Sequence, residues 1–97
     1  MHEVVGSLVV ELEDESVAVA LYKSLLPEAR RPPSYRSRVV LKLERGRVVV
    51  EIRSRDLTSF RAAFNGFARL IHAALSSLDS AAGSRRSFYR GASPVIP

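Results

Sequence analysis

The sequence lacks cysteine, has only two lysines, and contains no apolar run as long as a membrane span. The missing cysteine excludes disulfides and thiol chemistry. The short apolar runs exclude a transmembrane helix. The N-terminus has neither the basic region nor the cleavage pattern of a signal peptide, so we expect a cytoplasmic protein.

A catalytic set of residues is missing as well. His2 lies at the N-terminus, and His72 stands alone on the polar side of a predicted helix. Neither has an acid or a nucleophile at a diagnostic spacing. No cluster of His, Asp and Glu has metal-ligand spacing, and there is no glycine-rich phosphate loop. We therefore expect no cofactor, no metal and a binding or scaffolding protein in place of an enzyme.

The composition indicates one small, basic, folded domain. The chain has 97 residues, of which 46% are hydrophobic, enough for a modest core. Its 15 Lys and Arg exceed its 10 Asp and Glu, for a net charge of +5. All but two of these cations are arginines, which bind phosphate and carboxylate with two hydrogen bonds. This balance favours a nucleic acid or an acidic partner.

Residues 36–78 predict a β-hairpin followed by a long helix, because the hydrophobic period changes from about 2 to about 3.6 at Asp56. Asp56 suits the helix N-cap, since its side chain accepts from first-turn amides and its charge favours the positive end of the dipole. With Arg45 and Gly46 as the loop, both strands place their larger apolar side chains on one face. These are Val39, Leu41, Leu43, Val48, Val50 and Ile52.

The same register gathers four arginines on the opposite face of the hairpin. Arg38 falls across from Arg53, and Arg36 falls across from Arg55. Like charges directly opposite each other are unfavourable in a sheet. One interpretation is that these side chains fan into water and pair with nearby acids, namely Glu51, or Glu11 and Glu13. The other is an anion site, above all for phosphates.

Two elements precede the hairpin. Residues 4–12 alternate as a strand does, and residues 15–26 have a helical apolar line. That line consists of Val17, Ala20, Leu21 and Leu25. Asp14 or Ser16 suits the start of this helix, and Pro27 is expected to end it or to lie just past its end.

The element order predicts an α+β fold, a β-α-β-β-α two-layer sandwich with a three-stranded antiparallel sheet and two helices packed on one face. A right-handed crossover places the first strand beside the third, in the order 1-3-2. The first and second strands are then open edges, which a homodimer resolves by pairing them. We assign residues 1–80 to the single domain and residues 81–97 to a basic, flexible C-terminal tail.

The long helix has two unlike sides. The stripe that we assign to the core consists of Phe60, Phe64, Phe67, Ile71, Ala74 and Leu78. The other flank is partly apolar and has mostly small side chains. It consists of Ala62, Gly66 and Ala73, with Leu70 between them. A glycine inside a helix costs about 1 kcal/mol relative to alanine, so close packing is expected there. The packing element is either the first helix of the same chain or a helix of a partner.

Several stretches carry a resemblance to a known family. They are Leu25-Leu26-Pro27-Glu28, the junction from Glu51 to Thr58, and Arg61 to Ile71, with Asp56, Arg61-Ala62 and Asn65 as the most diagnostic positions. Over about residues 8–78 the chain resembles the Pcc family, the small dimerisation subunit of the KEOPS (EKC) complex, which is related to the CTAG/LAGE proteins. It departs from the family at Gly66, where a small polar residue is usual, and at Phe60, where Leu is more common.

The resemblance implies a non-catalytic subunit of the machinery that places a threonylcarbamoyl group on the adenosine beside the tRNA anticodon. It implies a homodimer formed through the sheet, helices that bundle with the catalytic ASKHA-fold threonylcarbamoyltransferase subunit, and help in holding tRNA. The residues that suit partner-helix packing are Ala62, Asn65, Gly66, Arg69, Leu70 and Ala73. Those that suit tRNA phosphates are Arg36, Arg38, Arg53 and Arg55. The alternatives are a free-standing RNA-binding domain with a basic sheet face, and a small enzyme that acts alone.

Overall fold

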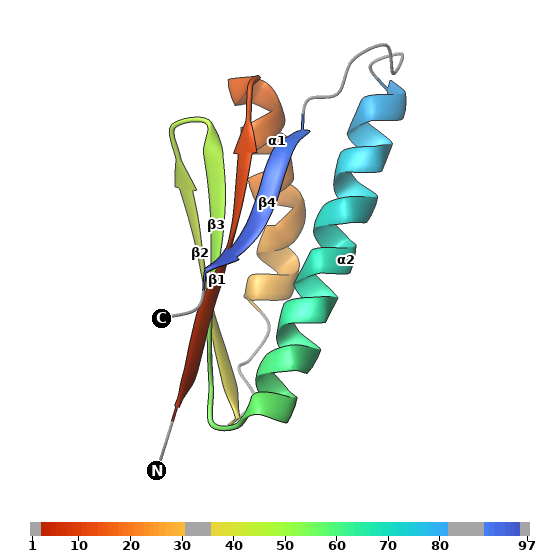
Figure 1. Cartoon of the computed structure of the whole chain (residues 1–97). Coiled ribbons are helices and arrows are strands. Elements are labelled where there is room, and N and C mark those ends of the chain that lie inside the picture. The colour runs from red at the N-terminus through yellow and green to blue at the C-terminus, as the bar shows by residue number, and fades with distance from the viewer. Residues whose placement is uncertain (1–2, 31–35, 82–88, 96–97) are drawn as a thin grey trace.

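A computed structural model describes residues 3–30, 36–81 and 89–95 of the chain. Its elements are β1 (Val4–Leu12), α1 (Glu15–Ala29), β2 (Ser37–Glu44), β3 (Arg47–Ser54), α2 (Leu57–Ala81) and β4 (Tyr89–Val95). They form two layers, with both helices on the same face of one antiparallel sheet (Figure 1). The predicted α+β fold is confirmed.

The sheet has the strand order β2-β3-β1-β4. The predicted order of the first three strands is therefore confirmed. The hairpin register is also as predicted, because Leu41 pairs with Val50 and Arg38 with Arg53. In the centre of the sheet, β3 pairs with β2 on one side and with β1 on the other.

Strand β4 was not predicted. It pairs antiparallel with β1 from Ser7 to Leu12, and the register shifts between Glu11 and Leu12. Consequently the sheet has four strands in place of three, and β1 is not an open edge. Gly91 and Pro94 within β4 gave no strand signal, although proline is tolerated on an edge strand. Residues 82–88, which belong to the predicted flexible tail, lie outside the described residues, and the division of the chain at residue 80 stays a prediction.

The core lies between the sheet and the two helices. β3 contributes Val48, Val50 and Ile52, all fully buried, and the pattern along β1 and β3 alternates as the sequence predicts. The stripe on α2 is confirmed, with Phe60, Phe67 and Ile71 buried and its other three members packed against them. On α1, Ala18 is fully buried and Ala20 is only half-buried, so the predicted line is shifted at that position.

Both helices begin at an aspartate cap. Asp14 accepts a hydrogen bond from the Ser16 amide at 2.8 Å, and Asp56 accepts one from the Ser59 amide at 2.7 Å. Each bond satisfies an amide that has no partner within its own helix. The expectation that Asp56 caps α2 is confirmed.

The prediction that Pro27 ends the first helix is wrong. Pro27 lies inside α1, which continues to Ala29, and the Arg30 amide donates to the Leu26 carbonyl oxygen at 2.8 Å. The fixed φ of proline is compatible with a helix. Proline lacks a backbone N–H, so the hydrogen bond from this residue to the preceding turn is missing. Near the end of a helix the loss of this one bond is tolerated. The extra turn places Glu28 on the helix.

The β2–β3 turn depends on Gly46. This residue has a φ of 68°, and its carbonyl oxygen accepts from the Leu12 amide at 2.8 Å, which ties the turn to the end of β1. A Cβ at this position would lie 3.3 Å from the Leu12 carbonyl oxygen. The turn therefore requires a residue that tolerates the left-handed region beside another backbone.

We expect Gly46→Ala to lower the free energy of unfolding by about 1–2 kcal/mol, because alanine is strained at positive φ. Gly46→Asn adds a Cβ at the same point, but asparagine tolerates this conformation better, so we expect a smaller loss. Urea denaturation of the two variants measures the difference. Equal losses would mean that the contact with Leu12, and not the backbone conformation, determines the cost.

Candidate functional site: a helix groove and an arginine cluster

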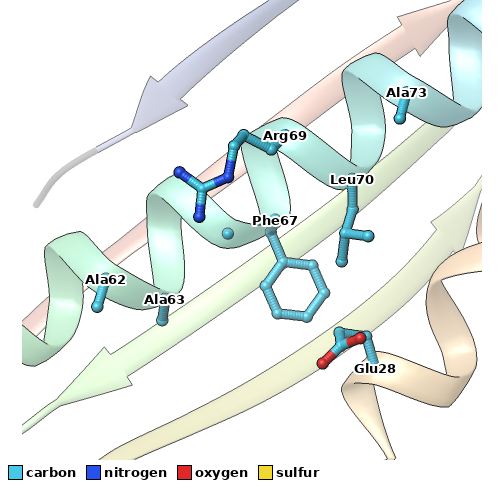
Figure 2. A pocket seen from close by; sticks show the side chains of 8 residues that line it. Glu28, Ala62, Ala63, Phe67, Arg69, Leu70 and Ala73 are labelled. Carbon is cyan, nitrogen blue, oxygen red and sulfur yellow. The ribbon is translucent and has the colours of Figure 1, made fainter.

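The outer flank of α2 forms a shallow groove of about 540 Å³. It is lined by Glu28 of α1 and by Ala62, Ala63, Gly66, Phe67, Arg69, Leu70 and Ala73 of α2. Figure 2 shows Phe67 and Leu70 pointing to the side where Glu28 lies, whereas Arg69 lies at the edge of the groove away from Glu28. Five of the six residues predicted for partner-helix packing are thus brought together, and the exposed Asn65 is not among those that line the groove.

Gly66 lies at an open point of this flank. A Cβ built on Gly66 would meet no atom within 4 Å, so the first helix of the same chain makes no close contact at this position. Leu70 on the same flank is 37% exposed. Packing of a partner helix on this flank stays a prediction.

Sequence reasoning missed Glu28 as a groove residue. It lies in the last turn of α1, opposite the α2 flank (Figure 2). The signal was present in the adjacent Leu-Leu-Pro-Glu stretch, but Pro27 was interpreted as the end of the helix. Together with Arg69, Glu28 gives the apolar groove one acidic and one basic residue.

The four predicted arginines gather at one end of the hairpin. Arg38 pairs with Arg53 in the ladder, and the Arg55 amide donates to the Arg36 carbonyl oxygen at 2.8 Å, which continues the same register. Since Val39 and Ile52 face the helices, Arg38 and Arg53 project from the opposite face of the sheet. We call these four residues the arginine cluster.

Two carboxylates approach the arginine cluster. The Arg53 guanidinium lies 3.2 Å from Glu3, and the Arg36 guanidinium lies 3.5 Å from Asp56. These four side chains are between 44% and 57% exposed, so solvent screens both ion pairs strongly. Neither acid was among those considered above, and Glu11 pairs with Arg47 at the other end of the sheet. Glu51 lies on the same face of the sheet as Arg53, opposite Val40 in the ladder.

Asp56 connects the arginine cluster to α2. The hydrogen bonds from the Ser59 backbone and side chain hold the pKa of Asp56 below its ordinary value of 3.8, and the nearby Arg36 and Arg55 lower this pKa further. The carboxylate is therefore charged throughout the neutral range. It both caps α2 and holds the Arg36 side chain.

The groove and the arginine cluster are separate surfaces. The groove belongs to the helix layer, and the arginine cluster projects from the far face of the sheet. His72 is exposed on α2 and is not part of either surface. Within the described ranges, no group of three His, Asp or Glu side chains is placed to hold a metal, and neither helix is both long and apolar enough to cross a membrane.

A small α+β sandwich with an open helix groove and a basic sheet end is the class of protein that these observations define. Comparison with known proteins agrees. The family model described as "Transcription factor Pcc1" matches residues 6–79. The KEOPS complex subunit Pcc1 of Pyrococcus abyssi (strain GE5 / Orsay) is 37% identical over 74 residues, which cover 76% of this chain and 90% of that protein. The chain belongs to the Pcc1 family, and β4 lies beyond the matched range.

We expect Asp56→Ala to destabilise the protein at neutral pH, because the α2 cap and the contact with Arg36 are both lost. The folded-state pKa of Asp56 is lowered from its ordinary value of 3.8, so its stabilisation is fully present well above that value and is lost as the pH falls below it and through the lowered folded-state pKa. Thermal unfolding at a series of pH values measures the gap between wild type and variant. The matched control is Asp56→Asn, which keeps a cap acceptor and loses only the charge. A gap that stays constant down to pH 2 would contradict the charged role.

Proposed function

We propose that this chain is the non-catalytic, dimeric scaffold subunit of a KEOPS complex that modifies tRNA with threonylcarbamoyladenosine, acting in the cytoplasm. Its homodimer bridges two copies of the catalytic ASKHA-fold threonylcarbamoyltransferase subunit, and its basic surface helps to bind tRNA. Membership of the Pcc1 family and the relative named as a KEOPS subunit support this proposal. The open groove at Gly66 is the observation that carries it, because it offers a place for a partner helix.

The groove has the properties that a docking helix requires. Packed helices approach to about 8–10 Å between their axes, and small side chains at the contact allow the shortest distances. Ala62, Gly66 and Ala73 supply such a low surface along α2, and Leu70 and Phe67 supply apolar contact. An amphipathic helix binds such grooves with apolar side chains spaced three or four residues apart. Glu28 and Arg69 then fix its orientation through charge.

The arginine cluster suits the phosphates of tRNA. Guanidinium groups bind phosphate with two hydrogen bonds each, and such bonds are stronger than neutral ones. The ion pairs with Glu3 and Asp56 are exposed, so phosphate competes for these arginines at little cost. Contacts of this kind position a nucleic acid without reading its sequence.

The arginine cluster alone also fits a second function, a free-standing RNA-binding domain. The groove favours the first function, because an isolated RNA-binding domain does not require an open, partly apolar helix flank. Pull-down from native lysate separates them as well. Recovery of RNA without an ASKHA-type subunit would favour the second function and contradict the first.

We expect Gly66→Leu to weaken binding of the catalytic subunit at least tenfold, because the leucine side chain fills the groove. The fold is expected to survive, since no atom lies within 4 Å of a Cβ at this position. Calorimetric titration with the purified catalytic subunit measures the change.

The matched control for the groove is Gly66→Ala. Alanine is the better helix former by about 1 kcal/mol, so this variant is expected to be more stable than wild type and to lose less affinity than the leucine variant. Unchanged affinity of the leucine variant would show that the partner binds elsewhere. Unfolding of the leucine variant would mean that Gly66 packs inside its own chain.

We expect the double variant Arg53→Gln and Arg55→Gln to bind tRNA more weakly and with less salt dependence. Each lost phosphate contact makes the slope of log K against log salt shallower by roughly 0.7–0.9. The control is Arg45→Gln with Arg47→Gln, which removes the same charge at the other end of the hairpin. Equal effects of the two double variants would mean that only the net charge of the chain matters.

A further inference from the structure

Strand β4 is the feature from which the inference starts. It spans Tyr89–Val95 and pairs antiparallel with β1 from Ser7 to Leu12 (Figure 1). The match to the Pcc1 family covers residues 6–79, so β4 lies outside the part of the chain that resembles the family. In the described residues β1 lies between β3 and β4, and without β4 it would be an edge of the sheet.

The edge of β1 is a strong template for strand pairing. Its nine residues include four valines and two leucines, and neither lysine nor proline is among them. Natural sheets use lysine and proline to keep the strands of other molecules off an edge. The one charged residue of β1 is Glu11, close to the end of the strand. An uncovered β1 would therefore pair with extended strands of other molecules.

The hydrogen bonds to β3 determine which groups of β1 are left for β4. The Leu12 amide donates to the Gly46 carbonyl oxygen at 2.8 Å, and these two residues lie opposite each other when the β1–β3 register is continued. In an antiparallel ladder hydrogen-bonded pairs alternate with non-bonded pairs, so the even-numbered residues of β1 bond to β3. The backbone N–H and C=O groups of Ser7, Val9 and Glu11 therefore point to β4.

The register of β4 separates its inward from its outward backbone groups. The partners of these three β1 residues are, in the same order, Val95, Ser93 and Gly91, whose backbone groups point to β1. Ala92 and Pro94 alternate with them, so their backbone groups point to the outer edge. Proline has no N–H, and at this outward position the ladder with β1 requires none. The outer edge of β4 thus lacks a donor that a further strand would need.

We propose that β4 is a closing strand, which occupies the edge of β1 and presents an outer edge that blocks a further strand. The sheet then cannot be extended on this side. Short edge strands and proline on an edge are both devices against edge-to-edge association. β4 combines them, since it has seven residues and carries Pro94 at an outward position. The inference does not depend on the proposed function, because neither the groove nor the arginine cluster includes a residue of β4.

The core is expected to survive the loss of β4. A continuous set of buried apolar side chains already joins β1, β3 and the two helices. Of the other elements, β1 alone is in extensive contact with β4. Segments with few contacts to the core open locally while the rest stays folded. A variant that releases β4 therefore exposes the β1 edge on a folded domain.

Proline substitution in the full chain tests the pairing of β4. Ser93→Pro removes an N–H that bonds to β1, whereas the matched control Ala92→Pro removes one that points outward. We expect the amides of Val9 and Glu11 to exchange roughly tenfold faster in the first variant and at the wild-type rate in the control. The Val10 amide bonds to β3 in every form and serves as the internal reference.

The mass of the particle in solution measures the consequence. On concentration, wild type and Ala92→Pro are expected to reach a limiting mass in light scattering, because a closed edge ends the sheet. The mass of Ser93→Pro is expected to keep rising, since its uncovered β1 accepts strands of other molecules.

A second pair of variants tests the outer edge without disturbing the ladder. Pro94→Val restores an outward N–H, so this variant is expected to associate further than wild type as its concentration rises. Ala92→Val adds the same side chain where an outward N–H already exists. It is the matched control and is expected to behave as wild type in the same light-scattering series.

The outcomes separate this inference from the proposed function. Slow exchange of the Val9 amide in Ser93→Pro, or fast exchange without a rise in mass, would overturn the closing role. If the Val10 reference also exchanges fast, the core needs β4, and an unchanged mass of Pro94→Val would then overturn the proposal. None of these results affects binding of the catalytic subunit or of tRNA, and failure of that binding would leave the role of β4 standing.

Discussion

The register of β3 against its two neighbours is the constraint on which the rest of the structure depends. Val48, Val50 and Ile52 face the helices and are fully buried, while the residues between them face away. A shift by one residue would bring Glu51 and Arg53 into the core and expose the valines. Gly46 and its hydrogen bond to Leu12 hold this register at the turn. The same register sets Arg38 beside Arg53, so the core and the basic surface are two consequences of one pairing.

Much of this arrangement could be predicted from the sequence, because local patterns determine it. The alternation on both sides of Arg45-Gly46 fixed the hairpin, and the aromatic stripe with Asp56 before it located α2 and its buried side. The flank of small residues on α2 indicated a packing surface, because glycine disfavours a helix and Gly66 therefore suggested close contact at that position.

Other features depended on contacts that local patterns do not encode. β4 contains glycine and proline and becomes a strand by pairing with the β1 edge, so its sequence carries no strand signal. Pro27 usually marks the end of a helix, but here α1 continues past it to Ala29, beside α2. Because Glu28 lies on that extra turn, its part in the groove could not be predicted. Glu3 and Asp56, which form ion pairs with Arg53 and Arg36, lie just before β1 and α2. The strand register therefore could not predict these two pairs.

The helix groove and the arginine cluster suit a protein that binds more than one partner at a time. The groove lies in the helix layer, and the arginine cluster lies on the far face of the sheet. Two ligands can therefore bind without competing for the same atoms. In the proposed function these ligands are the catalytic subunit and tRNA. The small size of the domain suffices, because α1, α2, β2 and β3 pack around the core and also present these two surfaces.

The most direct test is the mass of the complex in solution. When the purified chain is mixed with the catalytic ASKHA-fold subunit, light scattering is expected to give a particle that contains two copies of each protein. This stoichiometry is expected if each copy recruits one catalytic subunit and also binds a second copy of the chain. A particle with one copy of each protein, or a mixture whose components elute separately, would contradict the claim that this chain is the bridge.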